Sequence, residues 1–241
     1  MLNATPVVWS VTAQNLPEHA RNAIHTDDGA RAAGFPRALV AGVTTYAYLT
    51  HPIAAAWGLD WVRGGGGEVR FRRPVFDGEV VRCEPAADGD GVIVRALTAE
   101  PEQPRAVLRA ITDGGPPAPM RDGEPLITRR IELRGEWSAD YGQRAGDDFA
   151  LYANHGIVHP AVWPALANHV VHTQVARGSW IHTRSIVRHH GLAAAGSTAA
   201  VSAVVVRRFQ SHGERALLDV HIEVDGTLVA TLEHEAIIEL P

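Results

Sequence analysis

The stretch "ALVAGVTTYAYLTHPIAAAWG" (residues 38–58) decides the fold, because its apolar residues recur at nearly helical spacing. A second stretch, "IVHPAVWPALANHVVHTQVARG" (157–178), has the same character. Each is followed by strand-like sequence that ends in a turn glycine. An apolar helix can bury all of its sides only if a sheet curls around it. The sequence therefore predicts an α+β protein in which a long helix wrapped by an antiparallel sheet occurs twice.

The spacing of turn residues indicates an internal duplication. Gly42 precedes Gly78 by 36 positions, and Pro160 precedes Gly196 by the same 36 positions. The two halves are therefore offset by 118 residues, which is the kind of regular self-similarity expected of a repeated unit.

The two halves are separated by "GGPPAPMRDGEP" (114–125), in which three glycines and four prolines crowd together. Such a stretch continues neither a helix nor a central strand, so it reads as a connector. We predict an N-terminal half at 1–118 and a C-terminal half at 119–241.

The strands are clearest near the C-terminus. From Leu218 to Val224, apolar and polar residues alternate with the period of a half-buried strand. Asp225-Gly226 then supplies the residues of a tight hairpin, and "TLVATLEHEAII" returns. This pattern predicts an antiparallel meander after the second helix.

Composition narrows the classes of function. The formal net charge is −5 with a pI near 6.2, so no overall basic character favours nucleic acid as a partner. The single cysteine, Cys83, fits a reducing compartment. No run of about 18 apolar residues predicts a membrane span. The N-terminal sequence lacks the pattern of a signal peptide, so we expect a cytoplasmic protein, compatible with a homodimer.

The segment before the first helix carries polar residues in an ordered pattern. Asn22 and His25 lie three apart, and Gly34-Phe35 and then Gly42 follow. This order resembles the hydratase motif of the MaoC-like, (R)-specific enoyl-CoA hydratases, which have the hotdog fold. The tandem arrangement is similar to that of their double-hotdog members. The resemblance implies an acyl thioester substrate, on coenzyme A or an acyl carrier protein, and no cofactor.

The same resemblance assigns roles in the first half. His25 falls on the family's histidine, Asn22 on its asparagine, and the N–H of Gly42 on the group that polarises the thioester carbonyl. Ala20, however, stands where the family has its catalytic aspartate, and Ala41 replaces the histidine before the glycine. The sequence leaves open whether Glu18 takes the place of this missing aspartate. We predict His25, Asn22 and Gly42 as catalytic residues.

The second half departs from the motif differently. Asp147 falls on the catalytic aspartate, but Phe149 and Tyr152 replace the asparagine and the histidine. His159 matches the histidine at the helix start, and Pro160 follows it, which has no N–H to offer a carbonyl oxygen. A composite site that pairs Asp147 with the histidine of the first half is an alternative hypothesis.

Several residues have a simpler interpretation beside the functional one. His25 could also have a purely structural role, in which its hydrogen bond holds its own loop in place. Arg70 and Arg72 alternate along a strand, where they would bind a pantetheine-linked phosphate or simply face solvent. His169 and His172 lie one helical turn apart without an evident third ligand, so no metal site is predicted.

Two backbone features also carry predictions. The run "RGGGG" (63–67) lacks the residues of a phosphate-binding loop and predicts a flexible loop. Pro52 predicts a kink or a break in the first helix, because proline removes one helical hydrogen bond.

Three hypotheses for function remain at this point. The first is a hydratase or dehydratase (a hydro-lyase) that uses His25. The second is a binding module that holds an acyl thioester or another hydrophobic ligand without turning it over. The third is a thioesterase, although residues 43–57 contain none of the carboxylates that such enzymes use on the central helix.

Overall fold

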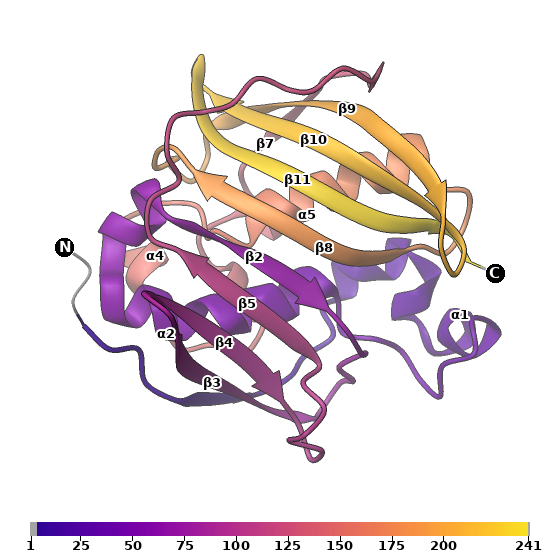
Figure 1. Ribbon diagram of the computed structural model, residues 1–241, viewed down its shortest axis with the longest axis horizontal. Coiled ribbons are helices and arrows are strands. Elements are labelled where there is room, and N and C mark those ends of the chain that lie inside the picture. The colour runs from indigo at the N-terminus through magenta and orange to yellow at the C-terminus, as the bar shows by residue number, and fades with distance from the viewer. Residues whose placement is uncertain (1–3, 241) are drawn as a thin grey trace.

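In the computed structural model, which describes residues 4–240, two helices cover one face of a long antiparallel sheet (Figure 1). The helices of more than five residues are α1 (Asp27–Ala32), α2 (Gly42–Gly64) and α5 (Val162–Val170). Shorter turns are η1 (Pro17–Arg21), η2 (Ala23–His25), η3 (Gly135–Trp137), α3 (Tyr141–Arg144), α4 (Leu151–Asn154) and the π-helical turn η4 (Val171–Val175).

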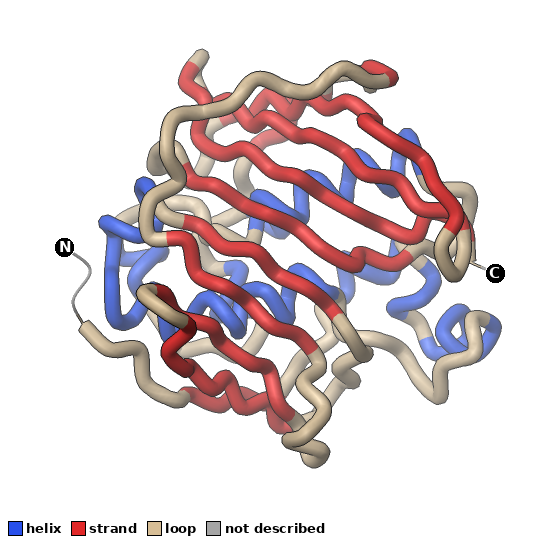
Figure 2. Tube along the Cα trace, viewed as in Figure 1, coloured by secondary structure: helices blue, strands red, loops and turns tan. Residues whose placement is uncertain are grey.

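The strands of the described residues form one continuous sheet across both halves (Figure 2). In the first half they are β1 (Trp9–Thr12), β2 (Gly66–Phe71), β3 (Val80–Asp88), β4 (Gly91–Leu97) and β5 (Ala106–Ile111). In the second half they are β6 (Glu124–Pro125), β7 (Arg129–Glu132), β8 (Ile181–His189), β9 (Thr198–Gln210), β10 (Glu214–Val224) and β11 (Thr227–Glu239).

The strand order shows that the second half repeats the first. The sheet runs β1-β3-β4-β5-β2 and continues β8-β11-β10-β9, with β7 beside β9. Isolated bridges join Leu39 to Phe76 and Ile157 to Ala194, and both members of the second pair lie 118 residues after those of the first. The predicted duplication and its offset are therefore confirmed. The boundary at 118 lies between β5 and β6 and stays a prediction.

Strands β2 and β8 join the halves at the centre of the sheet. Their register places Glu68 opposite Ile186, which is its own counterpart at the offset of 118. The two halves are thus related by a pseudo-twofold axis at this pair. An ion pair between Arg184 and Glu68, 2.9 Å apart, reinforces the junction.

The glycine run at this junction is not a flexible loop, so that prediction was wrong. Gly66 and Gly67 begin strand β2 and are buried. A Cβ on Gly66 would lie 2.1 Å from the carbonyl oxygen of Val187, and its φ of +144° is outside the range that side chains favour. Glycine is required here because the two halves approach so closely.

Helix α2 is buried on nearly all sides, as predicted for a helix inside a curled sheet. Tyr46, Leu49, Ile53 and Trp61 have no exposed surface. The helix continues through Pro52, so the predicted break does not occur there, and the alternative of a kink at Pro52 stays a prediction. The interruption lies at Gly58, whose φ of +58° is accessible to glycine at little cost.

The second helix is shorter than its sequence pattern predicts. It begins at Val162, close to Pro160, and at Val171 it passes into the π-helical turn η4.

Within residues 4–240, no helix combines the length and the apolar character needed to cross a bilayer.

Candidate active site

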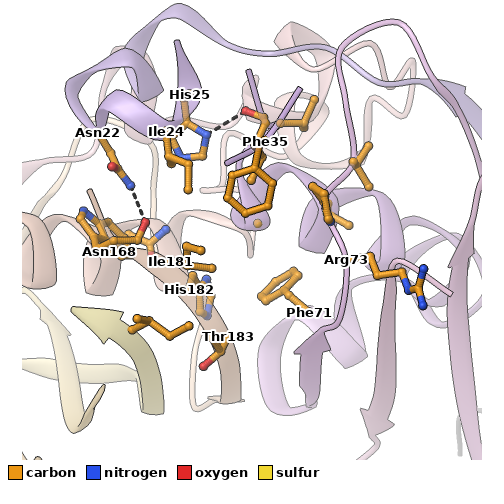
Figure 3. Close-up of a pocket in the computed structure, with 18 of the residues that line it drawn as sticks. Asn22, Ile24, His25, Phe35, Phe71, Arg73, Asn168, Ile181, His182 and Thr183 are labelled. Carbon is orange, nitrogen blue, oxygen red and sulfur yellow. Dashed lines mark hydrogen bonds between the residues drawn. The ribbon is translucent and has the colours of Figure 1, made fainter. Parts of the chain in front are cut away.

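A cavity of about 280 Å³ opens where the start of α2 meets the second half of the chain (Figure 3). One wall comes from η2, the start of α2 and the residues after β2. The other comes from α5, Trp180 and strand β8. The three residues predicted as catalytic, Asn22, His25 and Gly42, all line this cavity.

The His25 ring enters the cavity with one nitrogen already bonded. Its Nδ1 lies 2.8 Å from the carbonyl oxygen of Leu39 (Figure 3). A carbonyl only accepts, so Nδ1 carries the proton and Nε2 keeps its lone pair. Burial lowers the pKa of His25 to about 4, although the Leu39 carbonyl opposes part of this effect. The imidazole is therefore neutral near pH 7 and able to accept a proton.

Asn22 fixes the position of this loop against the second half. Its Nδ2 donates to the carbonyl oxygen of Trp180 over 2.9 Å, and the side chain is buried. Its Oδ1 has no partner within residues 4–240. Asn168 of α5 lines the same cavity, and its Oδ1 is likewise buried without a partner among these residues. Two amide oxygens are thus available to a water or a ligand hydroxyl.

Gly42 is the first residue of α2 and brings a helix N-terminus to the cavity. The N–H groups of Thr44 and Thr45 bond to Ala41, whereas the N–H groups of Gly42 and Val43 have no acceptor within residues 4–240. Unpaired N–H groups at a helix start attract negative charge. A Cβ at Gly42 would lie 3.4 Å from the Phe71 ring, so glycine keeps this approach open.

A buried polar chain behind the cavity wall was not predicted. Nε2 of His182 lies 2.8 Å from Oγ of Ser185, which lies 2.8 Å from Nδ1 of His234. Nδ1 of His182 has no partner within residues 4–240, and its residue lines the cavity. Ser185 faces His234 only because β8 pairs with β11 in that register, so no local sequence signal could reveal the group.

Arg70, Arg72 and Arg73 lie at this end of the sheet. Arg72 and Arg73 follow β2 and line the cavity at its mouth, and within residues 4–240 neither forms an ion pair. Arg70 does not line this cavity. It lies in a second hollow on the sheet, which Arg72 also lines, and it forms a 2.7 Å ion pair with Glu68. Of the two predicted phosphate-binding residues, only Arg72 lies at the cavity, and Arg73 was missed.

Comparison with known proteins identifies the architecture. No protein-family model and no curated protein sequence matches the chain. A solved structure from Mycobacterium tuberculosis, described as having a double hotdog fold, matches 97% of this chain and 96% of its own at a TM-score of 0.66 and 12% identity. The chain is a double hotdog.

Two other solved structures similar to this chain are assigned to different activities. A protein of Chloroflexus aurantiacus assigned as a MaoC-domain dehydratase matches 98% of this chain and 95% of its own, at 10% identity and a TM-score of 0.62. A Lactobacillus plantarum protein assigned as an oleoyl thioesterase matches 99% and 98%, at 13% identity and a TM-score of 0.50. At these identities the likeness establishes the fold, and the reaction has to be argued from the site.

Ala20, which stands where the family has its aspartate, does not line the cavity of this double hotdog. Ala20 is exposed and is not among the residues that line the cavity. Glu18, the substitute that the sequence left open, bonds to Arg144 at 2.5 Å. No Asp or Glu of residues 4–240 lines the cavity. His25 therefore has no carboxylate partner there.

The corresponding region of the second half is filled by side chains from both halves. Asp147 is buried and lies 2.9 Å from Nδ1 of His51, which comes from α2 of the first half. The Trp9 ring stacks on His51 with a centroid separation of 3.8 Å. Nδ1 of His159 accepts the N–H of Ala161. Asp147 is thus committed to His51, and the composite pair with His25 does not form.

Proposed function

We propose that this double hotdog is a hydratase or dehydratase that interconverts enoyl and 3-hydroxyacyl thioesters, carried on coenzyme A or an acyl carrier protein. One observation carries the proposal. The neutral His25, with Nδ1 bonded to Leu39, lines the same cavity as the unpaired N–H of Gly42. A base and an oxyanion donor at one cavity are the two groups that addition of water to an enoyl thioester requires.

In the hydration direction, Nε2 of His25 takes a proton from water as the water oxygen bonds to C3 of the substrate. The electron pair of the C2–C3 double bond moves toward the thioester carbonyl, whose oxygen becomes negative. The N–H of Gly42 stabilises that oxygen. Protonated His25 then returns its proton to C2, which completes the addition of water. The same residue serves as base and acid, because no Asp or Glu in the described part of the chain lines the cavity.

The surrounding residues would position the substrate and the water. The free Oδ1 of Asn22 would accept a hydrogen bond from the attacking water. Arg72 and Arg73 would bind the phosphate groups of the carrier at the mouth of the cavity, since guanidinium groups match phosphate geometry. The acyl chain would lie along Phe35, Leu39 and Phe71.

The absence of a carboxylate among the described lining residues bears on the two alternative functions, a thioesterase and a binding module. It disfavours a thioesterase that relies on an acid, because none of the described carboxylates lines the cavity. It favours a binding module, in which the same groups hold a thioester without turnover.

Turnover assays separate these functions. Purified protein is offered short, medium and aromatic enoyl-CoA and 3-hydroxyacyl-CoA thioesters, and products are resolved by mass spectrometry. We expect hydration and dehydration without release of free coenzyme A. Binding of one of these thioesters with no turnover would replace the enzyme by the binding module, and release of free coenzyme A would favour the thioesterase.

The pH dependence of kcat/KM should reflect the buried state of His25. The base acts only when neutral, and burial lowers its pKa to about 4. We therefore expect kcat/KM to stay constant from neutral pH to about pH 5 and to fall below about pH 4. Half-loss near the ordinary histidine value of about 6.5 would contradict the assignment.

This profile needs a parallel measurement of folding by circular dichroism. Burial also lowers the pKa of His234 to about 3 and that of His189 to about 4. Between about pH 6.5 and these values, the unfolded chain binds more protons than the folded one, so stability falls as the pH is lowered. Only activity lost while the protein remains folded reports on His25.

A further inference from the structure

The chain His182–Ser185–His234 ends on both sides in a nitrogen that has no partner among the described residues. At the cavity this is Nδ1 of His182, and at the far end it is Nε2 of His234. All three side chains are buried. The proposed hydration step uses none of them. Because each imidazole can hold its proton on either nitrogen, the direction of the hydrogen bonds decides what His182 presents to the cavity.

Two neutral arrangements satisfy the short contacts. In the first, His234 donates from Nδ1 to Ser185, whose hydroxyl donates to Nε2 of His182, so that Nδ1 of His182 carries a proton. In the second, all donors reverse, and Nδ1 of His182 has only a lone pair. Each arrangement leaves one buried N–H without an acceptor among the described residues, on Nδ1 of His182 in the first and on Nε2 of His234 in the second.

The place of the unpaired N–H favours the first arrangement. Buried N–H groups without an acceptor are rare in proteins. His182 lines the cavity and His234 does not, so only the N–H of His182 can be paired by an oxygen of a bound ligand. Burial and the neighbouring His234 ring hold the pKa of His182 well below its usual range, so the imidazole is neutral. His182 therefore presents a neutral N–H to the cavity.

This N–H lies beside the start of α2. Nδ1 of His182 is 3.5 Å from the position of a Cβ on Gly42. By the standard dimensions of the backbone, the amide nitrogen of Gly42 is then at most about 6 Å from Nδ1. Two donors that each approach one oxygen at about 2.9 Å can be separated by nearly this distance. One substrate oxygen can therefore receive both groups.

We propose that His182 donates its Nδ1–H to the same substrate oxygen as the N–H of Gly42, and that Ser185 and His234 fix this tautomer. His182 is thus a second oxyanion donor, supplied by the half of the chain in which the motif is degenerate. The proposal rests on the proposed function for its substrate, but the tautomer is a property of the protein alone. The acid–base role of His25 is unchanged by it.

The tautomer is measured first, in the wild-type protein without substrate. Nitrogen-15 NMR of the side chains, with His182 assigned through the backbone, should show a protonated Nδ1 and an unprotonated Nε2 at pH 7. Adding butyryl-CoA, a saturated thioester that cannot be hydrated, should shift the Nδ1–H signal downfield. Protonation at Nε2 instead of Nδ1 would overturn the proposal, even if the protein proves to be a hydratase.

Kinetics of variants then test the role in turnover. Ser185→Ala should lower kcat for enoyl-CoA hydration by roughly 10-fold with little change in KM, because a positioning hydroxyl acts through the transition state. Ser185→Thr, which keeps the hydroxyl, should recover most of the loss. His182→Leu should lower kcat by roughly 10²–10³-fold, the effect of losing one oxyanion donor.

His190→Gln provides the matched control. His190 also bonds through Nε2 to a hydroxyl, that of Thr231, but it does not line the cavity. Its variant should keep wild-type kcat and KM. If folded His182→Leu or Ser185→Ala keeps the wild-type kcat, the role in catalysis is overturned. If the wild type hydrates no thioester, the proposed function fails, and the NMR result still decides the tautomer.

Discussion

Replacing His25 by alanine is expected to lower the turnover of enoyl-CoA hydration by roughly 10²–10⁴-fold, the usual contribution of a general acid–base residue. The loss should appear in kcat, because His25 acts mainly in the transition state. Affinity for a saturated acyl-CoA should change far less. The measurement is a steady-state comparison of wild type and His25→Ala, with ligand affinity determined by calorimetry.

A structural role for His25 would give a different result. If its bond to Leu39 only latches the loop, His25→Ala lowers the free energy of unfolding, while the turnover of folded protein stays unchanged. Asp147→Asn is the matched control for the second half, since it keeps a hydrogen-bonding side chain beside His51. We expect Asp147→Asn to leave kcat unchanged, and a large loss in this variant would restore Asp147 as a candidate acid.

Replacing Gly42 by proline should remove the oxyanion donor without disturbing the helix. Proline is favoured at the first position of a helix, where its missing N–H has no helical partner. Ala41, with φ of −61° and ψ of 142°, already has the extended conformation that a following proline needs. The second half carries Pro160 at the corresponding position. We expect kcat to fall by roughly 10²–10³-fold.

Gly42→Ala separates the loss of the N–H from the added bulk. An alanine Cβ would lie 3.4 Å from the Phe71 ring and 3.5 Å from Nδ1 of His182, which is close to ordinary contact. We expect Gly42→Ala to keep far more activity than Gly42→Pro. Equal losses in both variants would mean that space at this position matters, and that the N–H does not.

The sequence predicts the repeated architecture well, because the signals are local and occur twice. The two apolar stretches became α2 and α5, and the offset of 118 residues reappears in paired bridges of the sheet. The errors concern the long-range packing of the backbone. Gly66 is buried because β8 approaches it, and α2 bends at Gly58 although Pro52 is the stronger breaker of helices.

Some residues of the candidate site could be predicted from a local motif, and others are brought together only by long-range packing. Asn22, His25 and Gly42 lie within one segment of 21 residues, so a motif could reveal them together. His182 and Ser185 meet His234 only through the pairing of two strands from distant parts of the sequence. The spacing of the motif also placed the family's aspartate at Ala20. Ala20 is exposed and does not line the cavity, so Ala20→Asp would add a charge outside it.

A crystal structure with bound butyryl-CoA tests most directly whether this cavity holds a thioester for hydration. We predict that the thioester carbonyl oxygen lies within about 3 Å of the amide nitrogen of Gly42, as expected for an oxyanion donor. Nε2 of His25 should face C2 and C3, directly or through one water. A thioester bound outside the cavity, or with its carbonyl directed away from Gly42, would contradict the assignment of this site.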